Sequence, residues 1–124
     1  MALRIVRMGS PRASGEGLRI GTVRRPPRGV PKEDYAKRDF YDAWLPDLAP
    51  TAPVIARAHK DWSAFVKAYR REMSKPAAQR LLEVLAQLSQ GSNFSVGCYC
   101  EDESRCHRSI LRELLAEHGA KLHA

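Results

Sequence analysis

The sequence contains no apolar run near the roughly 18 residues that a membrane-spanning helix requires, which excludes an integral membrane helix. It also lacks an apolar signal segment at its N-terminus, so we expect a cytoplasmic protein with no membrane partner. Only three cysteines are present, and in a reducing compartment we expect thiols that serve a metal or catalysis rather than a structural disulfide. Internal repeats and the signatures of helix-turn-helix, zinc-finger and RNA-recognition modules are missing as well, which disfavours these nucleic-acid-binding folds.

The length and composition of the chain are those of one globular domain. The chain has 124 residues, of which 44% are hydrophobic, enough for a single core without disulfide support. We therefore predict one domain over residues 1–124, with frayed ends at 1–2 and 120–124.

Positive charge is unevenly placed along the chain. Residues 1–38 carry ten lysines and arginines against three acidic residues, whereas residues 39–124 carry eleven of each, so the net charge of +7 lies in the first third. The excess is concentrated in Arg19, Arg24, Arg25, Arg28 and Lys32. Such asymmetry indicates an anionic partner, either a small molecule or a nucleic acid, although a solvated basic surface has the same composition.

Apolar periodicity predicts the regular elements. Strands are expected over 3–8, 18–24 and 94–100, and helices over 61–73, 75–90 and 107–118. Between them, 32–39 can form a short helix and 40–45 an extended segment. Asp61 is placed to cap the first long helix and Ser74 the second, which has Pro76 in its first turn.

All three cysteines and one of the four histidines lie between residues 98 and 107. A strand, a polar loop and a helix follow one another there, which places Cys106, His107 and Arg108 at a turn beyond the carboxyl end of a strand. This is where open α/β sheets usually bind their ligands. Cys98 shares the apolar face of the strand, so we expect it in the core.

Three stretches keep a characteristic order and spacing: Val23-Arg-Arg-Pro-Pro-Arg-Gly, Trp44-Leu-Pro-Asp-Leu-Ala-Pro-Thr and Asp61-Trp-Ser-Ala-Phe-Val-Lys-Ala-Tyr-Arg-Arg-Glu-Met. They resemble the YeaO-like branch of a bacterial family called domain of unknown function 488 (DUF488). Cys98-x7-Cys106-His107-Arg108 resembles the signature of the wider family. The resemblance covers nearly the whole chain, and it implies no reaction because the family has none assigned.

The resemblance implies an α/β fold, which the order of elements independently allows. We predict a single small domain with a mostly parallel sheet flanked by helices, and a C-terminal strand–turn–helix that carries Cys-His-Arg. The strand 94–100 should lie inside the sheet. Two positions depart from the family pattern: Val23 stands where the branch has an acidic residue, and Cys100 where the wider family often has glutamate. Roles that depend on those two carboxylates do not carry over.

The Cys-His-Arg turn can bind an anion and activate a thiol. A helix N-terminus offers unpaired N–H groups, and Arg108 adds a planar fork suited to phosphate or carboxylate. Because parallel strands end at one edge of a sheet, we expect Arg24 and Arg28 to meet it there. The same positive field favours the thiolate of Cys106 or Cys100, with His107 as its base. The candidate catalytic residues are Cys106, His107 and Cys100, and the candidate anion-binding residues are Arg108, Arg24 and Arg28.

A zinc site of Cys98, Cys100, Cys106 and His107 is the obvious rival. Cys98 and Cys100 are alternate residues of the predicted strand and would lie about 6.6 Å apart, too far for two thiolates on one zinc ion. Cys106 and His107 are neighbours at a helix start, where side chains diverge by about 100°. On these grounds we expect no metal and no cofactor. A three-ligand site of Cys100, Cys106 and His107 and a Cys100–Cys106 redox pair both stay open.

These observations favour an enzyme-like domain that binds an anionic small molecule, a phosphate or a carboxylate, at the Cys-His-Arg turn. One alternative is a non-catalytic nucleic-acid-binding or regulatory module that uses the basic first third. The other is a metal or thiol-redox module. The oligomeric state is not encoded in any pattern of the sequence.

Overall fold

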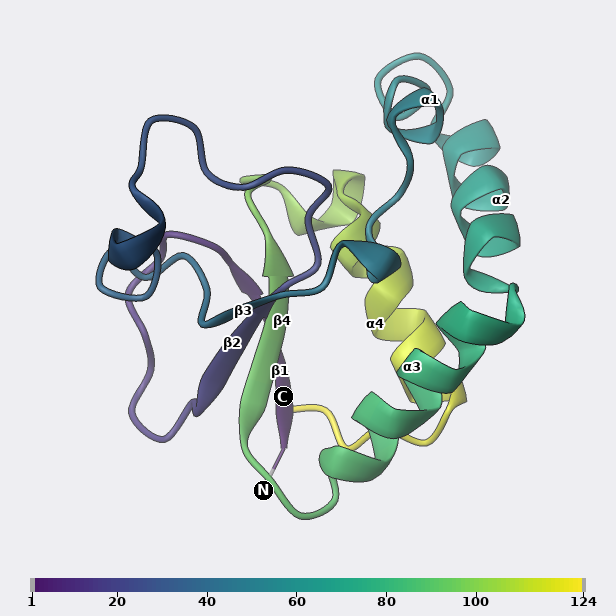
Figure 1. Cartoon of the computed structure of the whole chain (residues 1–124). Coiled ribbons are helices and arrows are strands. Elements are labelled where there is room, and N and C mark those ends of the chain that lie inside the picture. Colours follow the sequence, from purple (N-terminus) through teal and green to yellow (C-terminus); the bar gives the residue numbers. More distant parts are fainter. Residues whose placement is uncertain (1, 124) are drawn as a thin grey trace.

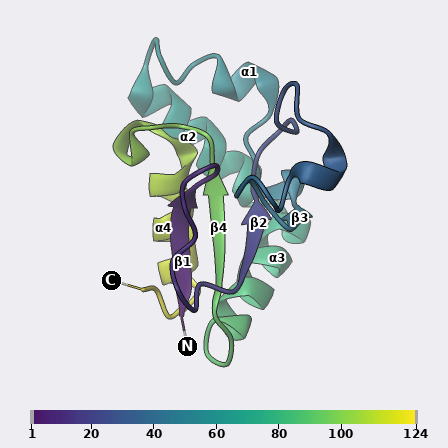
Figure 2. The same cartoon turned by 90° about the vertical axis from the view of Figure 1, so that its left-hand side faces the viewer.

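Four short apolar stretches pair side by side in a computed structural model, which describes residues 2–123. They are β1 (Leu3–Arg7), β2 (Leu18–Gly21), β3 (Ala43–Trp44) and β4 (Phe94–Cys98). The sheet order is β1-β4-β2-β3, and every neighbouring pair is parallel (Figure 2). The predicted α/β fold is therefore confirmed, and so is the interior position of the C-terminal strand.

The three long helices lie together on one face of this sheet, and the short one lies beyond its carboxyl edge (Figure 1). The helices are α1 (Ala52–Ile55), α2 (Trp62–Met73), α3 (Pro76–Leu88) and α4 (His107–Glu117), with 3-10 turns at Lys32–Asp34, Pro46–Leu48 and Glu103–Arg105. Figure 1 shows α2, α3 and α4 on one side and the loops of the first forty residues on the other. The sheet is thus flanked by helices on one face and by loops on the opposite face. No helix within residues 2–123 is long and apolar enough to cross a membrane.

Local chemistry explains where two of these helices begin. The Asp61 carboxylate accepts a hydrogen bond from the Ala64 N–H at 3.1 Å, which confirms its role as N-cap of α2. Pro76 occupies the first turn of α3 as predicted, but Lys75 rather than Ser74 is the N-cap. Ser74 instead ends α2, where its hydroxyl donates to the Arg71 carbonyl at 2.6 Å.

Two apolar clusters hold the layers together. The larger lies between the helices and the sheet, and it includes the fully buried Leu3, Val96, Tyr69 and Leu111. The smaller lies at the carboxyl end of the strands, and its buried members are Met8, Val23, Tyr41, Cys98 and Cys106. Cys98 is therefore in the core, as predicted, but in the cluster that borders the site.

Three strands are shorter than predicted, although β1 loses only its last residue and ends at Arg7. β2 stops at Gly21 and β4 stops at Cys98, so Tyr99 and Cys100 have left the sheet. β1 passes very close to β4 at Gly97. A Cβ at this position would overlap the Val6 carbonyl oxygen and the Met8 side chain. Glycine is the residue that such a close approach allows.

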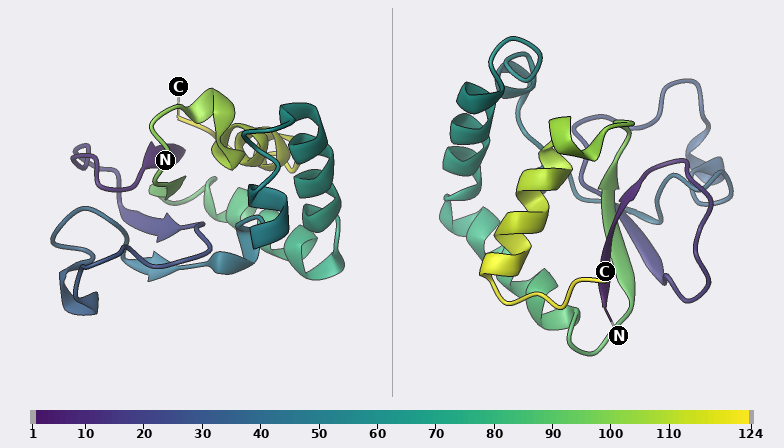
Figure 3. Two further views of the ribbon diagram at one scale, coloured as in Figure 1. Left: turned by 90° about the horizontal axis from the view of Figure 1, so that it is seen from above. Right: turned by 180° about the vertical axis from the view of Figure 1, so that it is seen from behind.

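The chain end pairs with β1 rather than fraying at residues 120–123. The Leu3 N–H donates to the Lys121 carbonyl at 2.8 Å, and the His123 N–H donates to the Leu3 carbonyl at 2.8 Å. Figure 3 shows this segment running beside the start of β1. Residues 1 and 124, for which fraying was also predicted, lie outside the described residues.

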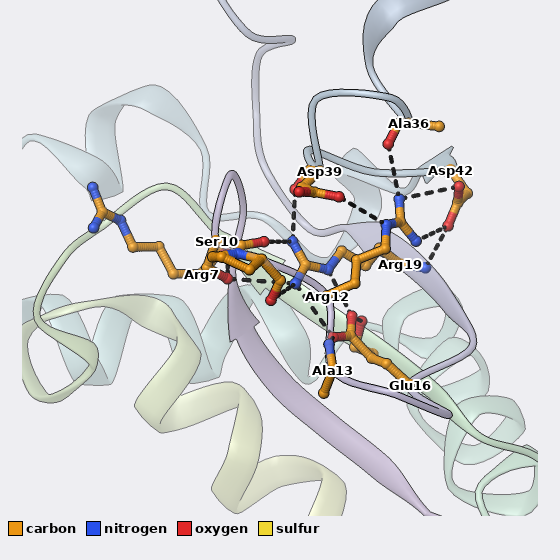
Figure 4. Close-up of polar contacts among 11 residues, drawn as sticks. Arg7, Ser10, Arg12, Ala13, Glu16, Arg19, Ala36, Asp39 and Asp42 are labelled. Atoms are coloured by element: carbon orange, nitrogen blue, oxygen red, sulfur yellow. Dashed lines mark hydrogen bonds and ion pairs between the residues drawn. The ribbon is translucent and has the colours of Figure 1, made fainter.

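Part of the basic first third is internal. Arg19 is fully buried, and its Nε donates to the Glu16 carboxylate at 2.6 Å (Figure 4). Its Nη1 donates to the carbonyl oxygens of Ser10 at 2.7 Å and Asp39 at 2.6 Å, so the guanidinium fastens several loops together. Burial alone would raise the pKa of Glu16, but hydrogen bonds from Arg19, Ala13 and Ser95 lower it to about 2. Arg19 is thus unable to serve an external anionic partner.

Candidate functional site

A pocket of about 630 Å³ opens at the carboxyl edge of the sheet, where β2 and β4 end side by side. One wall is the loop 23–28 that follows β2, and another is the chain around α1. The segment after β4 and the start of α4 complete it. The pocket therefore lies at the edge where parallel α/β sheets usually bind ligands, as predicted from the sequence.

The arginines of the 23–28 loop have two different roles. Arg24 is half-buried, and it donates to the carbonyl oxygens of Ala49 at 2.9 Å and Pro50 at 3.2 Å. It thereby ties one wall of the pocket to the other. Arg25 and Arg28 are exposed, line the pocket, and make no side-chain hydrogen bond or ion pair with any described residue. Their guanidinium groups are free to meet an anion.

The three thiols lie close together, and two of them, Cys98 and Cys100, line this pocket. The sulfur atoms of Cys98 and Cys100 are 3.6 Å apart, and those of Cys98, Cys100 and Cys106 all lie within 4.8 Å of one another. Cys98 and Cys106 are buried, whereas Cys100 is exposed. The expectation that strand spacing separates Cys98 from Cys100 was wrong, because β4 ends at Cys98 and the next two residues fold away from the ladder.

His107 is held in one orientation. Its Nε2 lies 2.7 Å from the Thr22 carbonyl oxygen, which can only accept, so Nε2 carries a proton. The other nitrogen, Nδ1, is 3.8 Å from the sulfur of Cys106. The ring packs edge-on against the buried Tyr69 with centroids 5.5 Å apart, and the Tyr69 hydroxyl donates to the Leu48 carbonyl. This arrangement directs Nδ1 toward the thiols.

The pKa values of the three thiols shift in different directions. Hydrogen bonds from Cys100 and Cys98 lower the pKa of Cys106, with a further contribution from His107, against the opposing effect of burial. The pKa of Cys98 is raised by its hydrogen bonds to Cys100 and Cys106 and by burial. The pKa of Cys100 is raised, mainly by its hydrogen bond to Cys106. These shifts favour Cys106 as the thiol that loses its proton most readily.

Arg108 supports the loop rather than the pocket wall. Its side chain is buried, and its Nη2 donates to the Cys100 carbonyl oxygen. Its Nε is also buried and has no hydrogen-bond partner among the described residues. Arg108 does not line the pocket, which instead combines the 24–28 arginines with His107. Of the predicted site residues, Arg24, Arg28, Cys100 and His107 share the pocket, and Cys106 lies beside it.

The loop between Cys100 and α4 is braced by its own polar residues. Arg112 on α4 forms two hydrogen bonds to the Glu103 carboxylate, at 2.8 and 3.0 Å. The Asp102 carboxylate accepts hydrogen bonds from the N–H and hydroxyl groups of Ser104 at 3.0 and 2.7 Å. The acidic residues of this loop are thus engaged in holding its shape.

Sequence reasoning missed the apolar wall of the pocket and the Thr22 carbonyl. Phe40 and Ile55 line the pocket from segments interrupted by prolines, where periodicity gives no signal. Thr22 acts through its backbone, which no side-chain pattern reveals. Cys98 was expected only in the core, but it also lines the pocket.

Comparison with known proteins identifies a family. Residues 3–119 match a family model described as "DUF488-N3a: Active DUF488-N3 subclade". The match spans almost the whole chain, as the resemblance of the separate motifs suggested. No curated protein and no solved structure matches the chain.

Proposed function

The chain belongs to the DUF488 family, and we propose that this member is a small enzyme-like domain that binds an anionic molecule, a phosphate or a carboxylate, beside the Cys-His-Arg turn. One observation carries the proposal. A single pocket is lined by two unpaired arginines, two cysteines and a histidine. The description of the matching family model as the active subclade is consistent with chemistry at such a site.

The pocket binds its ligand through both charged and apolar contacts. Arg25 and Arg28 bind the anionic group, because planar guanidinium groups form paired, charge-assisted hydrogen bonds with phosphate and carboxylate oxygens. Arg24 positions their loop through its bonds to the opposite wall. Phe40 and Ile55 hold the apolar body of the ligand.

The reacting end of the ligand lies against the thiols. Cys106 and His107 form a pair in which Nδ1 is the nearest base to the sulfur, while the Thr22 carbonyl fixes the ring by its bond to Nε2. A nucleophile, a base and a group that orients the base are the elements of covalent catalysis. Cys100 is the exposed thiol of the pocket, and Arg108 positions it through a hydrogen bond to the Cys100 carbonyl.

The contacts of the basic residues favour a small anion over a nucleic acid as the ligand. Arg19 is buried against Glu16, and Arg12 forms an ion pair with Asp42 at 2.8 Å. The free arginines of the 24–28 loop line a concave pocket. A nucleic-acid-binding module usually presents a continuous basic surface. We place the protein in the cytoplasm, where its thiols stay reduced.

Binding of inorganic phosphate and phenyl phosphate tests this function. Isothermal titration of the metal-free, reduced protein at constant ionic strength should show one site, with phenyl phosphate the tighter ligand because its ring contacts the apolar wall. Loss of one charge-assisted contact in Arg28→Ala or Arg25→Ala should weaken binding by about tenfold. Arg80→Ala is the matched control, since Arg80 is an exposed arginine of α3 outside the pocket.

The outcome that would contradict the proposal is equal affinity in the pocket and control variants. Binding of nonspecific DNA that falls steeply with salt, and falls further in Arg28→Ala, would favour the nucleic-acid alternative instead.

A further inference from the structure

We propose that Cys98, Cys100 and Cys106 bind one thiophilic divalent cation of the Zn²⁺ class, with a fourth coordination position open to the pocket. The proposal deepens the proposed function and rests on it only for the ligand that would occupy the open position. In the metal-bound protein the sulfur of Cys106 is a metal ligand, so its role as a nucleophile belongs to the metal-free protein. Three observations carry it: the spacing of the sulfur atoms, the bracing of the segment that holds them, and the direction in which they face.

The sulfur atoms are already close to the spacing of a metal site. Zinc–thiolate bonds of about 2.3 Å in a tetrahedral arrangement place sulfur atoms about 3.8 Å apart. Cys98 and Cys100 are 3.6 Å apart, and all three sulfur atoms lie within 4.8 Å of one another. Small side-chain rotations complete the geometry, so binding needs no rearrangement of the fold.

The chain holds these residues from two firm elements. Cys98 ends the central strand, where every residue is buried, and Cys106 is the N-cap of α4. Between them, Arg108 donates to the carbonyl of Cys100, and Arg112 fixes the loop through Glu103. Such preorganisation of ligands is what a stable metal site requires.

The open position follows from what faces the pocket. Cys98 and Cys100 line it, so a cation bound to their sulfur atoms borders the ligand space. His107 lies 3.8 Å from Cys106 through Nδ1 but is not within the mutually close set of donors. Three protein ligands with one exchangeable position are typical of catalytic rather than structural zinc. When bound, such an ion supplies a Lewis acid that polarises the pocket ligand.

Cobalt titration tests the site directly, without any pocket ligand. The reduced protein is stripped with a chelator and titrated with Co²⁺ under anaerobic conditions. We expect one equivalent to bind with thiolate-to-cobalt charge-transfer bands, and Zn²⁺ to displace it one-for-one because zinc stands above cobalt in affinity for such donors. Absence of these bands in the reduced wild type would overturn the proposal.

Variants assign the ligands. Cys100→Ser changes an exposed residue and should leave the fold intact by circular dichroism, yet weaken Co²⁺ binding at least about tenfold because one thiolate is lost. Cys98→Ser and Cys106→Ser should do the same. His107→Gln should keep one equivalent with its charge-transfer bands, and His59→Gln, on an exposed loop, is the control for adventitious histidine binding.

Two results would contradict the assignment. Unchanged Co²⁺ affinity in Cys100→Ser would show that Cys100 is not a ligand. Loss of binding in His107→Gln would show that histidine occupies the fourth coordination position. Arg28→Ala separates this inference from the proposed function: it should lose phosphate affinity and keep Co²⁺ affinity. A protein that binds phosphate but no Co²⁺ would overturn the metal site alone.

Discussion

At the scale of single residues, the same side-chain type serves opposite purposes according to its partners. Arg19 is buried and donates to one carboxylate and three backbone carbonyls, so it holds several loops together inside the molecule. Arg25 and Arg28 have no such partners and line the pocket. The sequence shows the basic excess but not this division, because the partner of Arg19, Glu16, lies in a loop without regular periodicity.

The Glu16–Arg19 pair predicts a pH-dependent stability. Its folded pKa of about 2 is below the ordinary value of 4.5, so the stabilising charge is fully present above about pH 5 and is lost as the pH falls through 2. Glu16→Gln leaves a buried guanidinium without its counter-charge and should cost about 3 kcal/mol at pH 7. In urea denaturation, the difference from wild type should shrink between pH 5 and pH 2.

Glu113→Gln is the matched control for that variant. Glu113 pairs with Arg70 at 2.9 Å on the surface, where such pairs contribute about 1 kcal/mol or less. A Glu16→Gln protein as stable as Glu113→Gln at pH 7 would show that the buried pair does not hold the loops.

At the scale of elements, the site depends on where β4 ends and α4 begins. Apolar alternation correctly predicts the strand and its burial, but it extends the strand to residue 100. That two-residue difference decides whether the sulfur atoms of Cys98 and Cys100 diverge or meet. Pattern methods locate ends poorly, because tertiary contacts set them. Here one such contact is the bond from Arg108 to the Cys100 carbonyl.

Because β4 packs closely against β1, we expect a single methyl group added at Gly97 to lower the stability of the protein strongly. Gly97→Ala places a Cβ against the Val6 carbonyl oxygen and the Met8 side chain, so the strands must separate. We expect a loss of about 2 kcal/mol or more in the free energy of unfolding measured with urea. Gly91→Ala is the control, since a Cβ added at Gly91 meets no other heavy atom within 4 Å. This variant should be as stable as wild type or slightly more stable. Equal stability of the two variants would contradict the observed strand contact.

At the scale of the whole molecule, a parallel sheet gathers distant parts of the chain at one edge. The 24–28 loop, the α1 region and the C-terminal turn are far apart in sequence and line one pocket. The sequence predicted this edge, because the family motifs imply an α/β sheet and the order of elements along the chain allows one. It did not predict the apolar wall, whose residues lie in segments without periodic pattern, or the role of Arg108, which acts on a backbone carbonyl that no side-chain pattern reveals.

The central claim is that free arginines and reactive thiols belong to one site, and alkylation of Cys100 tests it most directly. Iodoacetate and iodoacetamide react with the same thiol, but only iodoacetate carries an anionic group. In the metal-free native protein, the ratio of their rates at Cys100 should exceed the ratio in the urea-unfolded chain, because Arg25 and Arg28 attract the carboxylate. The ratio should fall in Arg25→Ala and Arg28→Ala and stay unchanged in Arg80→Ala. A native ratio equal to that of the unfolded chain would contradict the account.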